Sequence, residues 1–353
     1  MTTSLAPETQ THPLRQTWLT HPERFKGMRQ IDVAKELGVS EGEWVDACQG
    51  HESQRLVDQP TKFISLLPSV GEVMVLTRNP SAVHEKVGKF DHIELFERMG
   101  MAQVANHDVD LRIFLSHWYR IYAVTVDKNG RAQHSFQVFD TEGKAVHKVF
   151  MRPETDQEAW KEVVSTLVNS DTSPFKTQIV PKQSYSDPES IVIEDFQSTW
   201  DNMKDSHEFF GLLRRFDLNR IDALRLAGGD RAFRVNYDHF TKLLEKAAER
   251  EVPIMVFVAN RGCIQIHTGL VHKIACFGTW INVLDEKFNL HLRGDHIAEA
   301  WVVKKPTTDG TVTALELYDA DGNEIAMLFG ERKPGLKELT SWRELISELP
   351  LFI

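Results

Sequence analysis

Two hydrophobic patterns follow one another along the chain, and the same succession occurs twice. VAKELG at 33–38 and ALRLAG at 223–228 carry apolar residues at helical spacing. The later part of each half alternates apolar and polar residues, which is typical of strands with one buried face. Turn sequences separate these strands: DKNG, DTEG, TTDG and DADG. Consecutive hairpins predict a large antiparallel sheet, and helices that begin near Trp160 and Trp342 are expected to cover it.

The two halves match segment by segment, in the same order. VMVLTRN ends at Asn79 and its counterpart IMVFVAN ends at Asn260, and further on DLRIFLSH pairs with NLHLRGDH and FQVFDTEG with LELYDADG. This order predicts a tandem duplication of an α+β domain, in which a large antiparallel sheet is flanked by helices. We expect an N-terminal repeat at 1–185 and a C-terminal repeat at 186–353. The stretch 170–190, rich in Ser, Pro, Asp and Lys, is typical of a linker.

Composition excludes several classes of protein. The 353 residues carry a formal net charge of -10, which argues against a broad basic surface for nucleic acid. The longest apolar run, VPIMVFVA, is far shorter than the roughly 20 residues that cross a bilayer. The start, MTTSLAPETQTHPLRQ, lacks the apolar region of a secretory signal. Cys48, Cys263 and Cys276 lack the spacing of zinc or redox motifs, so we expect a cytoplasmic protein with free thiols.

The segment 28–44 resembles a helix-turn-helix, with Gly38 at its turn. We expect a structural helical hairpin instead, because Glu36, Glu41, Glu43 and Asp46 would repel phosphate. A DNA-binding regulator is therefore the weakest of three functional hypotheses, and no nucleic-acid partner is expected.

The fifteen histidines do not form a metal motif by spacing. His267 and His272, like His291 and His296, are five positions apart, which fits neither the helical pair of a zinc motif nor two neighbours on one strand face. We interpret these four as surface or strand histidines. Glycine-rich phosphate loops, the G-x-S-x-G elbow and HExxH are absent from the sequence.

The stretch DSHEFFGLL at 205–213 belongs to material that only the second half contains. If 198–216 form one helix, two apolar stripes result: Trp200, Met203, His207 and Phe210 on one, and Phe209, Leu213 and Phe216 on the other. Two alternatives stay open for His207. It is either a satisfied histidine of the core or a residue that faces a partner helix or a flat apolar ligand.

Several segments together resemble the HemS/ChuS/PhuS/HmuS family of cytoplasmic haemin-handling proteins: DSHEFFGLLRR, DLRIFLSHW, WVVKKPTTDG, LELYDADG and LFGERKPG. The resemblance covers nearly the whole chain. It implies that a duplicated α+β domain binds one haem (iron protoporphyrin IX) in a cleft between the halves.

The resemblance also implies roles for particular residues. His207 would ligate the iron from the proximal side, and Arg112 would lie on the distal side with Phe114 beside it on the same strand face. The residues that bind the propionates of haem match Lys305, Arg332 and the aromatic position 329. This chain has Phe329 where relatives often have tyrosine, so one propionate hydrogen bond is missing from the expected set.

The chemistry of haem agrees with this set of residues. A flat apolar disc with a Lewis-acidic iron and two carboxylates needs a neutral imidazole, apolar walls and cations at its edge. The sequence leaves two functions open. One is a cytoplasmic carrier that takes haem from an inner-membrane importer and delivers it to a haem oxygenase. The other is an enzyme that opens the macrocycle itself, with Arg112 as its catalytic residue.

Overall fold

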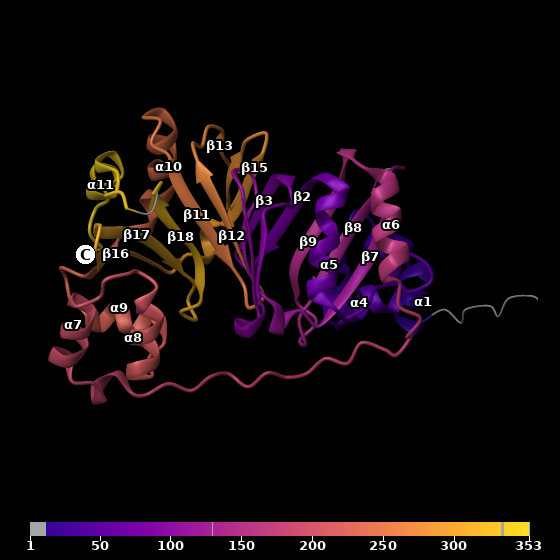
Figure 1. The fold of residues 1–353 in the computed structure, drawn as a ribbon, viewed down its shortest axis with the longest axis horizontal. Coiled ribbons are helices and arrows are strands. Elements are labelled where there is room, and N and C mark those ends of the chain that lie inside the picture. Colours follow the sequence, from indigo (N-terminus) through magenta and orange to yellow (C-terminus); the bar gives the residue numbers. More distant parts are fainter. Residues whose placement is uncertain (1–11, 129, 333–334, 353) are drawn as a thin grey trace, which may run out of the picture.

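The computed structural model describes residues 12–128, 130–332 and 335–352. Within these residues the strands form two nine-stranded antiparallel sheets (Figure 1). The first sheet has the order β1 (Ser53–Arg55), β7 (Arg120–Asp127), β8 (Ala132–Phe139), β9 (Ala145–Thr155), β2 (Gly71–Arg78), β3 (Ala82–Lys89), β15 (Phe288–Arg293), β14 (Trp280–Leu284) and β13 (Ile274–Phe277). The second has the order β10 (Ala232–Val235), β16 (Glu299–Thr307), β17 (Gly310–Tyr318), β18 (Glu324–Gly330), β11 (Ile254–Ala259), β12 (Cys263–Gly269), β6 (Asp110–Phe114), β5 (Met101–Ala105) and β4 (Ile93–Phe96).

These orders confirm the α+β class and show that the two halves exchange strands. Strands β13, β14 and β15 come from the second half but complete the first sheet, where Leu290 lies opposite His84. Strands β4, β5 and β6 come from the first half but complete the second sheet, where Arg112 lies opposite Ile264. Each repeat therefore lends three strands to the other. The division of the chain at 185 and 186 remains a prediction.

The inner faces of the two sheets enclose two apolar cores: one is formed by first-half residues together with Cys263, and the other by second-half residues together with Ala82. Helices α5 (Pro60–Leu66) and α6 (Gln157–Leu167) cover one core, and α10 (Phe240–Glu249) and α11 (Thr340–Ser347) cover the other. Trp160 of α6 stacks on Phe136 with ring centroids 3.9 Å apart, and Trp342 of α11 is fully buried. The two predicted closing helices are confirmed.

The outer face of the first sheet carries α1 (Pro13–Thr20), α2 (Pro22–Phe25), α3 (Gln30–Leu37) and α4 (Glu41–Ala47). The helical hairpin predicted at 28–44 is confirmed: Gly38 ends α3 at φ 72, and Ser40 opens α4 with a capping box to Glu43. Glu41 and Asp46 were expected to repel phosphate, but both are buried, and Glu41 pairs with Lys148 at 2.7 Å. Helix α4 is thus part of the core and presents no free face to a DNA groove.

The outer face of the second sheet carries α7 (Ile193–Asp201), α8 (Glu208–Phe216) and α9 (Arg220–Ala227). The single helix expected over 198–216 is wrong, since α7 ends at Asp201 and α8 begins only at Glu208. Polar side chains bind the backbone at this break. The Asn202 amide donates to the Ser198 carbonyl, and the Asp205 carboxylate accepts from the backbone N–H of His207. The two stripes drawn on one helix therefore belong to two helices.

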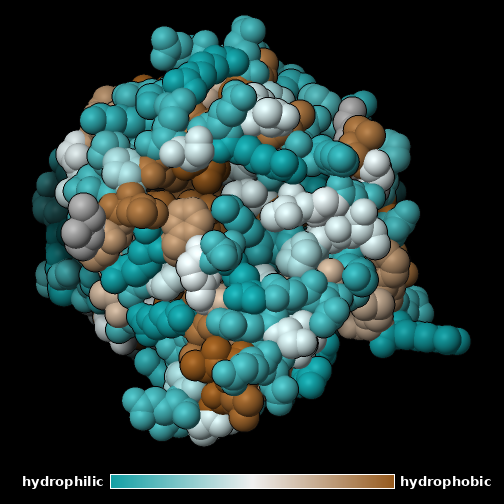
Figure 2. All heavy atoms as spheres, turned by 90° about the vertical axis from the view of Figure 1, so that its left-hand side faces the viewer, coloured by the Kyte–Doolittle hydropathy of each residue, from teal (hydrophilic) through white to brown (hydrophobic). Residues whose placement is uncertain are grey.

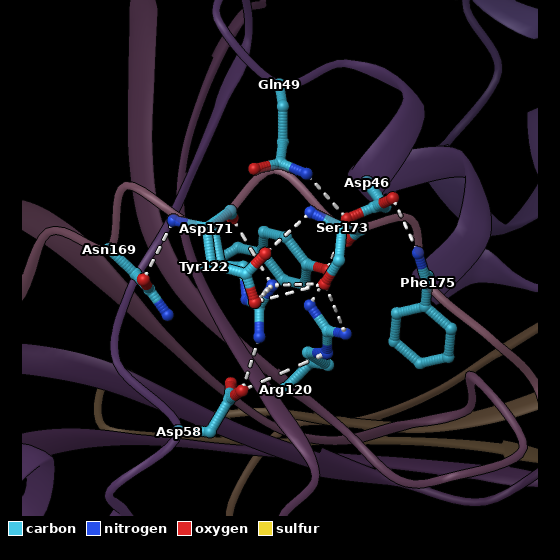
Figure 3. A network of polar contacts seen from close by, with 10 residues as sticks. Asp46, Gln49, Asp58, Arg120, Tyr122, Asn169, Asp171, Ser173 and Phe175 are labelled. Carbon is cyan, nitrogen blue, oxygen red and sulfur yellow. Dashed lines mark hydrogen bonds and ion pairs between the residues drawn. The ribbon is translucent and has the colours of Figure 1, made fainter.

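The linker runs along the lower edge of the molecule, from the first half to α7 (Figure 1). Its beginning is fixed to the first half by a polar network (Figure 3), in which Arg55 binds Asp171 at 2.8 Å and Asp46 accepts from the backbone N–H of Phe175 at 2.8 Å. Its end binds the second half, where the Ser186 N–H donates to the Asp217 carbonyl. Between these two anchors the chain is extended and mostly exposed.

The turns and the cysteines of the described residues are as expected from the sequence. The four turn sequences lie between β7 and β8, β8 and β9, β16 and β17, and β17 and β18, although Asn129 is outside the described residues. The three cysteines are free. Helices in the described ranges are all too short or too polar to cross a membrane. The opening residues 1–11, and residues 333–334 of LFGERKPG, lie outside the described residues.

Candidate functional site

His207 lies at the N-terminal end of α8, and its side chain is 88% exposed. Its Nδ1 is 2.6 Å from Oδ1 of Asp205, so the other ring nitrogen, Nε2, is the one left for a ligand. The interpretation of His207 as a satisfied core histidine is wrong. The exposure follows from the helix break, which puts His207 in the turn before α8 instead of on a buried stripe.

Helix α8 is held on the second sheet by its buried face. Phe209 and Leu212 are almost fully buried, and the Phe209 ring lies 5.1 Å from that of Trp200. Nζ of Lys305 lies 4.2 Å from the centre of the Phe209 ring, which fixes the start of α8 against β16. Phe210, one turn from His207, is 52% exposed. The helix thus buries one side and turns an imidazole and a phenyl ring toward solvent.

The strand residues predicted for the site share one face of the second sheet. Side chains directly opposite each other on paired strands point to the same face, as do alternate residues of one strand. Arg112 and Phe114 alternate on β6, and Lys305 lies on β16. The pairs that link them across the sheet are Arg112 with Ile264, Ile264 with Ala259, Met255 with Phe329, Phe329 with Ala314, and Ala314 with Val303.

The middle of this face is apolar and incompletely covered. Met255, Phe257, Ile264, Met327 and Phe329 are only half-buried, although their neighbours on the opposite face are fully buried. Four adjacent strands, β18, β11, β12 and β6, span about 14 Å at roughly 4.8 Å per strand. The floor thus has the width and polarity to accept a flat apolar ligand. Figure 2 views the end of the molecule that carries α7 and α8, where apolar side chains also reach the surface between polar ones.

Arg112 is restrained on this floor. Its guanidinium pairs with the carboxylate of Asp110 on the same strand face and also donates to the Leu111 carbonyl. Burial raises the pKa of Asp110, and the charge of Arg112 opposes that rise. The Arg112 side chain is 32% exposed, so it can still reach a ligand above the sheet.

The two predicted cations of the site have different surroundings. Lys305 is 4% exposed, and its Nζ lies 3.2 Å from Oε1 of Glu316, which also binds Arg220. Burial lowers the pKa of Lys305 to about 8, against the opposing effect of Glu316. Arg332 follows β18 and is half-buried. The backbone N–H of His207 contributes most to the lowered pKa of Asp205, and the charge of Arg332 contributes least.

Three carboxylates of this region were missed by sequence reasoning: Asp205, Asp110 and Glu316. Two of them had a sequence signal. Asp205 stands two residues before His207, and Asp110 two residues before Arg112. The third could not be found in this way, because Glu316 meets Arg220 and Lys305 only through the fold.

The remaining histidines do not gather into a metal centre within the described residues. His267 lies on a strand, as one interpretation had it, but it is buried and stacks on Phe288 with centroids 3.8 Å apart. His207 is an exposed imidazole at the start of α8, and this helix packs on the same face of the second sheet as the apolar floor.

Comparison with known proteins agrees with this picture. The family model described as "Haemin-degrading HemS.ChuX domain" matches residues 38–167 and 217–349. The hemin transport protein HmuS of Yersinia pestis is 37% identical over 95% of this chain and 97% of its own length. The hemin transport protein HemS of Yersinia enterocolitica is 37% identical over 90% of this chain and 92% of its own length.

Solved structures give the same result. Holo-PhuS, a heme-binding protein from Pseudomonas aeruginosa, superposes with a TM-score of 0.93 at 38% identity, covering 97% of this chain and 100% of PhuS. ChuS, described as an E. coli heme oxygenase, superposes with a TM-score of 0.85 at 35% identity, covering 94% and 98%. The fold, its repeat and these similarities together show that the chain belongs to the haemin-degrading HemS/ChuX domain family.

Proposed function

We propose that this protein binds haem over the apolar floor of the second sheet, with His207 as the axial ligand. The observation that carries the proposal is the exposed imidazole of His207, whose Nδ1 is bonded to Asp205 and whose Nε2 is left for a ligand. Relatives named for hemin transport and for heme binding support it. Bound haem would supply a Lewis-acidic iron and, if the ring is opened, the substrate itself.

The chain's own residues would divide the work of binding. Met255, Phe257 and Phe329 would contact the flat face of the ligand and exclude water from it. Arg332 would meet a propionate near the His207 loop, whereas Lys305 could do so only by competing with Glu316. Arg112 would hold a donor on the side opposite His207. The site includes β6 of the first half, so both halves contribute to it.

We further propose that the protein is a cytoplasmic carrier, which accepts haem after import and delivers it to a haem oxygenase. An exposed free thiol, Cys276, fits a reducing compartment. The transport names of the relatives support the carrier role. The position of His207 in an exposed turn would also let the ligand be released without unfolding the core.

A haem-degrading enzyme is the second candidate function. The observation that favours it is the placement of Arg112, whose guanidinium is held by Asp110 on the apolar floor and is ready to donate a hydrogen bond where charge develops. The relative ChuS is described as a heme oxygenase.

Titration of the purified protein with haemin, followed by visible absorption, tests the binding proposal. We expect a saturable complex whose spectrum changes in His207→Ala, while the fold persists because the His207 side chain is exposed and packs on no core residue. His272→Ala is the matched control, because His272 is exposed and outside the floor. A spectrum that His207→Ala leaves unaltered would exclude His207 as the ligand.

Arg112→Ala decides between carrier and enzyme. The complex is treated with a reductant in the presence of catalase, so that free peroxide does not destroy the haem. For an enzyme we expect the breakdown rate to fall at least about tenfold, since a single positioned donor is worth more in the transition state than in binding. An intact protein that leaves haem unaltered under these conditions would establish the carrier role alone.

A further inference from the structure

We propose that Asp205 is a positioning residue for His207, which fixes the ring with its proton on Nδ1 and so presents Nε2 to the iron. The inference rests on the proposed haem ligation and deepens it. One oxygen of Asp205, Oδ1, accepts both the backbone N–H of His207 at 2.7 Å and the ring Nδ1 at 2.6 Å. A single carboxylate oxygen thus binds the backbone and the side chain of the same histidine.

The loop that carries Asp205 is itself fixed on both sides. Met203, just before it, is almost fully buried under α7 and α8. The Lys204 carbonyl accepts from the backbone N–H of Thr308 at 2.9 Å, which ties the loop to the turn between β16 and β17. The Lys204 N–H donates to Oε2 of Glu208 at 3.1 Å, within the first turn of α8. The turn that carries the Asp205 carboxylate is therefore held in place by its neighbours.

The hydrogen bond between Asp205 and the His207 ring can do more than stabilise the turn before α8. A neutral imidazole can ligate a metal through either nitrogen, and the hydrogen bond made by the other nitrogen decides which one is available. A carboxylate acceptor also makes the ligating nitrogen more basic. In the open site the bond is exposed and weak, because the side chains of His207 and Asp205 are 88% and 61% exposed. A flat ligand over the imidazole would remove water from the bond and strengthen it.

A purely structural role is the competing explanation, because Asp205 also caps the turn before α8. The two roles predict different orders among substitutions. Asp, Asn and Ser side chains can all accept the backbone N–H two residues on, so a turn role alone makes Asp205→Asn and Asp205→Ser resemble the native protein. Positioning predicts a graded series. Asn keeps an acceptor within reach of Nδ1 but loses the charge, and Ser is too short to reach the ring.

The first experiment uses the haem-free protein. Nitrogen NMR of labelled histidine at mildly alkaline pH reports which ring nitrogen carries the proton. We expect Nδ1–H for His207 in the native protein and a shift toward Nε2–H in Asp205→Ser. Asp91→Ala is a matched control, since Nδ1 of His92 lies 2.8 Å from Asp91 outside the site and that variant should leave the His207 signal unaltered. Native His207 with its proton mainly on Nε2 would overturn the proposal.

The second experiment measures haem affinity for the same variants. Loss of a partner of this kind typically weakens metal binding about 10–100-fold, so we expect that loss in Asp205→Ser, a smaller loss in Asp205→Asn, and no change in Asp91→Ala. Equal affinity in all four proteins would reduce Asp205 to a cap. If His207→Ala binds haem as the native protein does, the proposed ligation fails, while the tautomer result for Asp205 stands or falls separately.

Discussion

Arg332 and Lys305 are the two cations expected at the edge of the site, and their surroundings differ among the described residues. Arg332 is half-buried just after β18, whereas Lys305 lies beneath α8 in a cluster with Glu316, Arg220 and Tyr318. The sequence predicted the same role, propionate binding, for both residues. Their surroundings indicate propionate binding for Arg332 and a stabilising role for Lys305.

Arg332→Ala should weaken haem binding without altering the axial ligand. A charge-assisted hydrogen bond is worth roughly 1.5–3 kcal/mol, so the dissociation constant should rise about tenfold to a hundredfold. Titration with haemin and with its dimethyl ester measures this effect. The native protein should prefer haemin, and the variant should lose most of that preference. Equal affinity of the native protein for both ligands would show that no cation contacts the propionates.

Lys305→Ala should act mainly on stability. It removes one partner of a fully buried carboxylate and leaves Glu316 with Arg220 and Tyr318, at a cost of about 1–3 kcal/mol. Urea denaturation of the haem-free protein measures this loss. Lys304→Ala is the control, because Lys304 lies on the opposite face of β16 and forms no ion pair with Glu316. A variant with native stability and much weaker haem binding would restore Lys305 as a direct propionate ligand.

Two glycines show how the packing of helices and strands decides whether a change to alanine stabilises or destabilises the protein. Gly330 ends β18 beneath α11, and a Cβ there would lie 2.6 Å from Cβ of Trp342. Gly211 lies inside α8, and a Cβ there would meet nothing within 4 Å. The same chemical change is thus forbidden at one element contact and open at the other.

Gly330→Ala should destabilise the protein by about 1–3 kcal/mol, because Trp342 cannot move out of a packed core without loss. Gly211→Ala should stabilise it by roughly 0.5–1 kcal/mol, since alanine is the better helix former. Thermal or urea unfolding of the pair measures both. A stabilised Gly330→Ala would show that α11 is not packed on β18 in solution.

The exchange of strands makes the molecule one body even though the chain is duplicated. Isolated 186–353 would lack β4, β5 and β6, and with them Arg112. Isolated 1–185 would lack β13, β14 and β15, as well as His207. Neither half alone should therefore form the native haem complex.

Cleavage of the linker should leave the two halves together. A protease site placed at 180–184, between the anchored ends of the linker, cuts the chain without touching either sheet. We expect the nicked protein to elute as one species of full mass and to give the native haem spectrum. Separation into two fragments under native conditions would contradict the exchanged sheets.

Buried histidines should make the whole molecule sensitive to acid. Burial lowers the pKa of His147 and of His267 to about 3, and that of His84 well below its usual range. Unfolded histidines titrate near 6.5, so the unfolded chain binds more protons than the folded one between about pH 6.5 and 3. The free energy of unfolding must therefore fall as pH falls through this window, by up to about 4 kcal/mol per pH unit for the three histidines together.

Urea denaturation at a series of pH values measures this slope. His84→Leu is the useful variant, because both ring nitrogens of His84 lack a hydrogen-bond partner among the described residues. An apolar side chain there should cost little and should reduce the slope by about one third. A slope that does not change would mean that His84 is protonated in the folded state or accessible to solvent.

The class of fold, the repeat and the hairpins could be predicted from the sequence, because alternation and turn residues act over short stretches of chain. It also pointed to His207 and Arg112 through the resemblance to a family. It failed at 198–216, where apolar spacing suggested one helix and local hydrogen bonds of Asn202 and Asp205 ended it. Spacing cannot register such competition between side chain and backbone.

The folded structure was needed to show which half completes which sheet, and hence that Arg112 shares a face with Phe329 and Lys305. It also decided that Lys305 is paired with Glu316 while His207 is exposed. The repeat makes the strands of the two halves alike, so their pattern does not state which partner each will choose. That choice depends on which apolar faces can be buried together in three dimensions. The pattern of residues along the chain does not specify these long-range contacts.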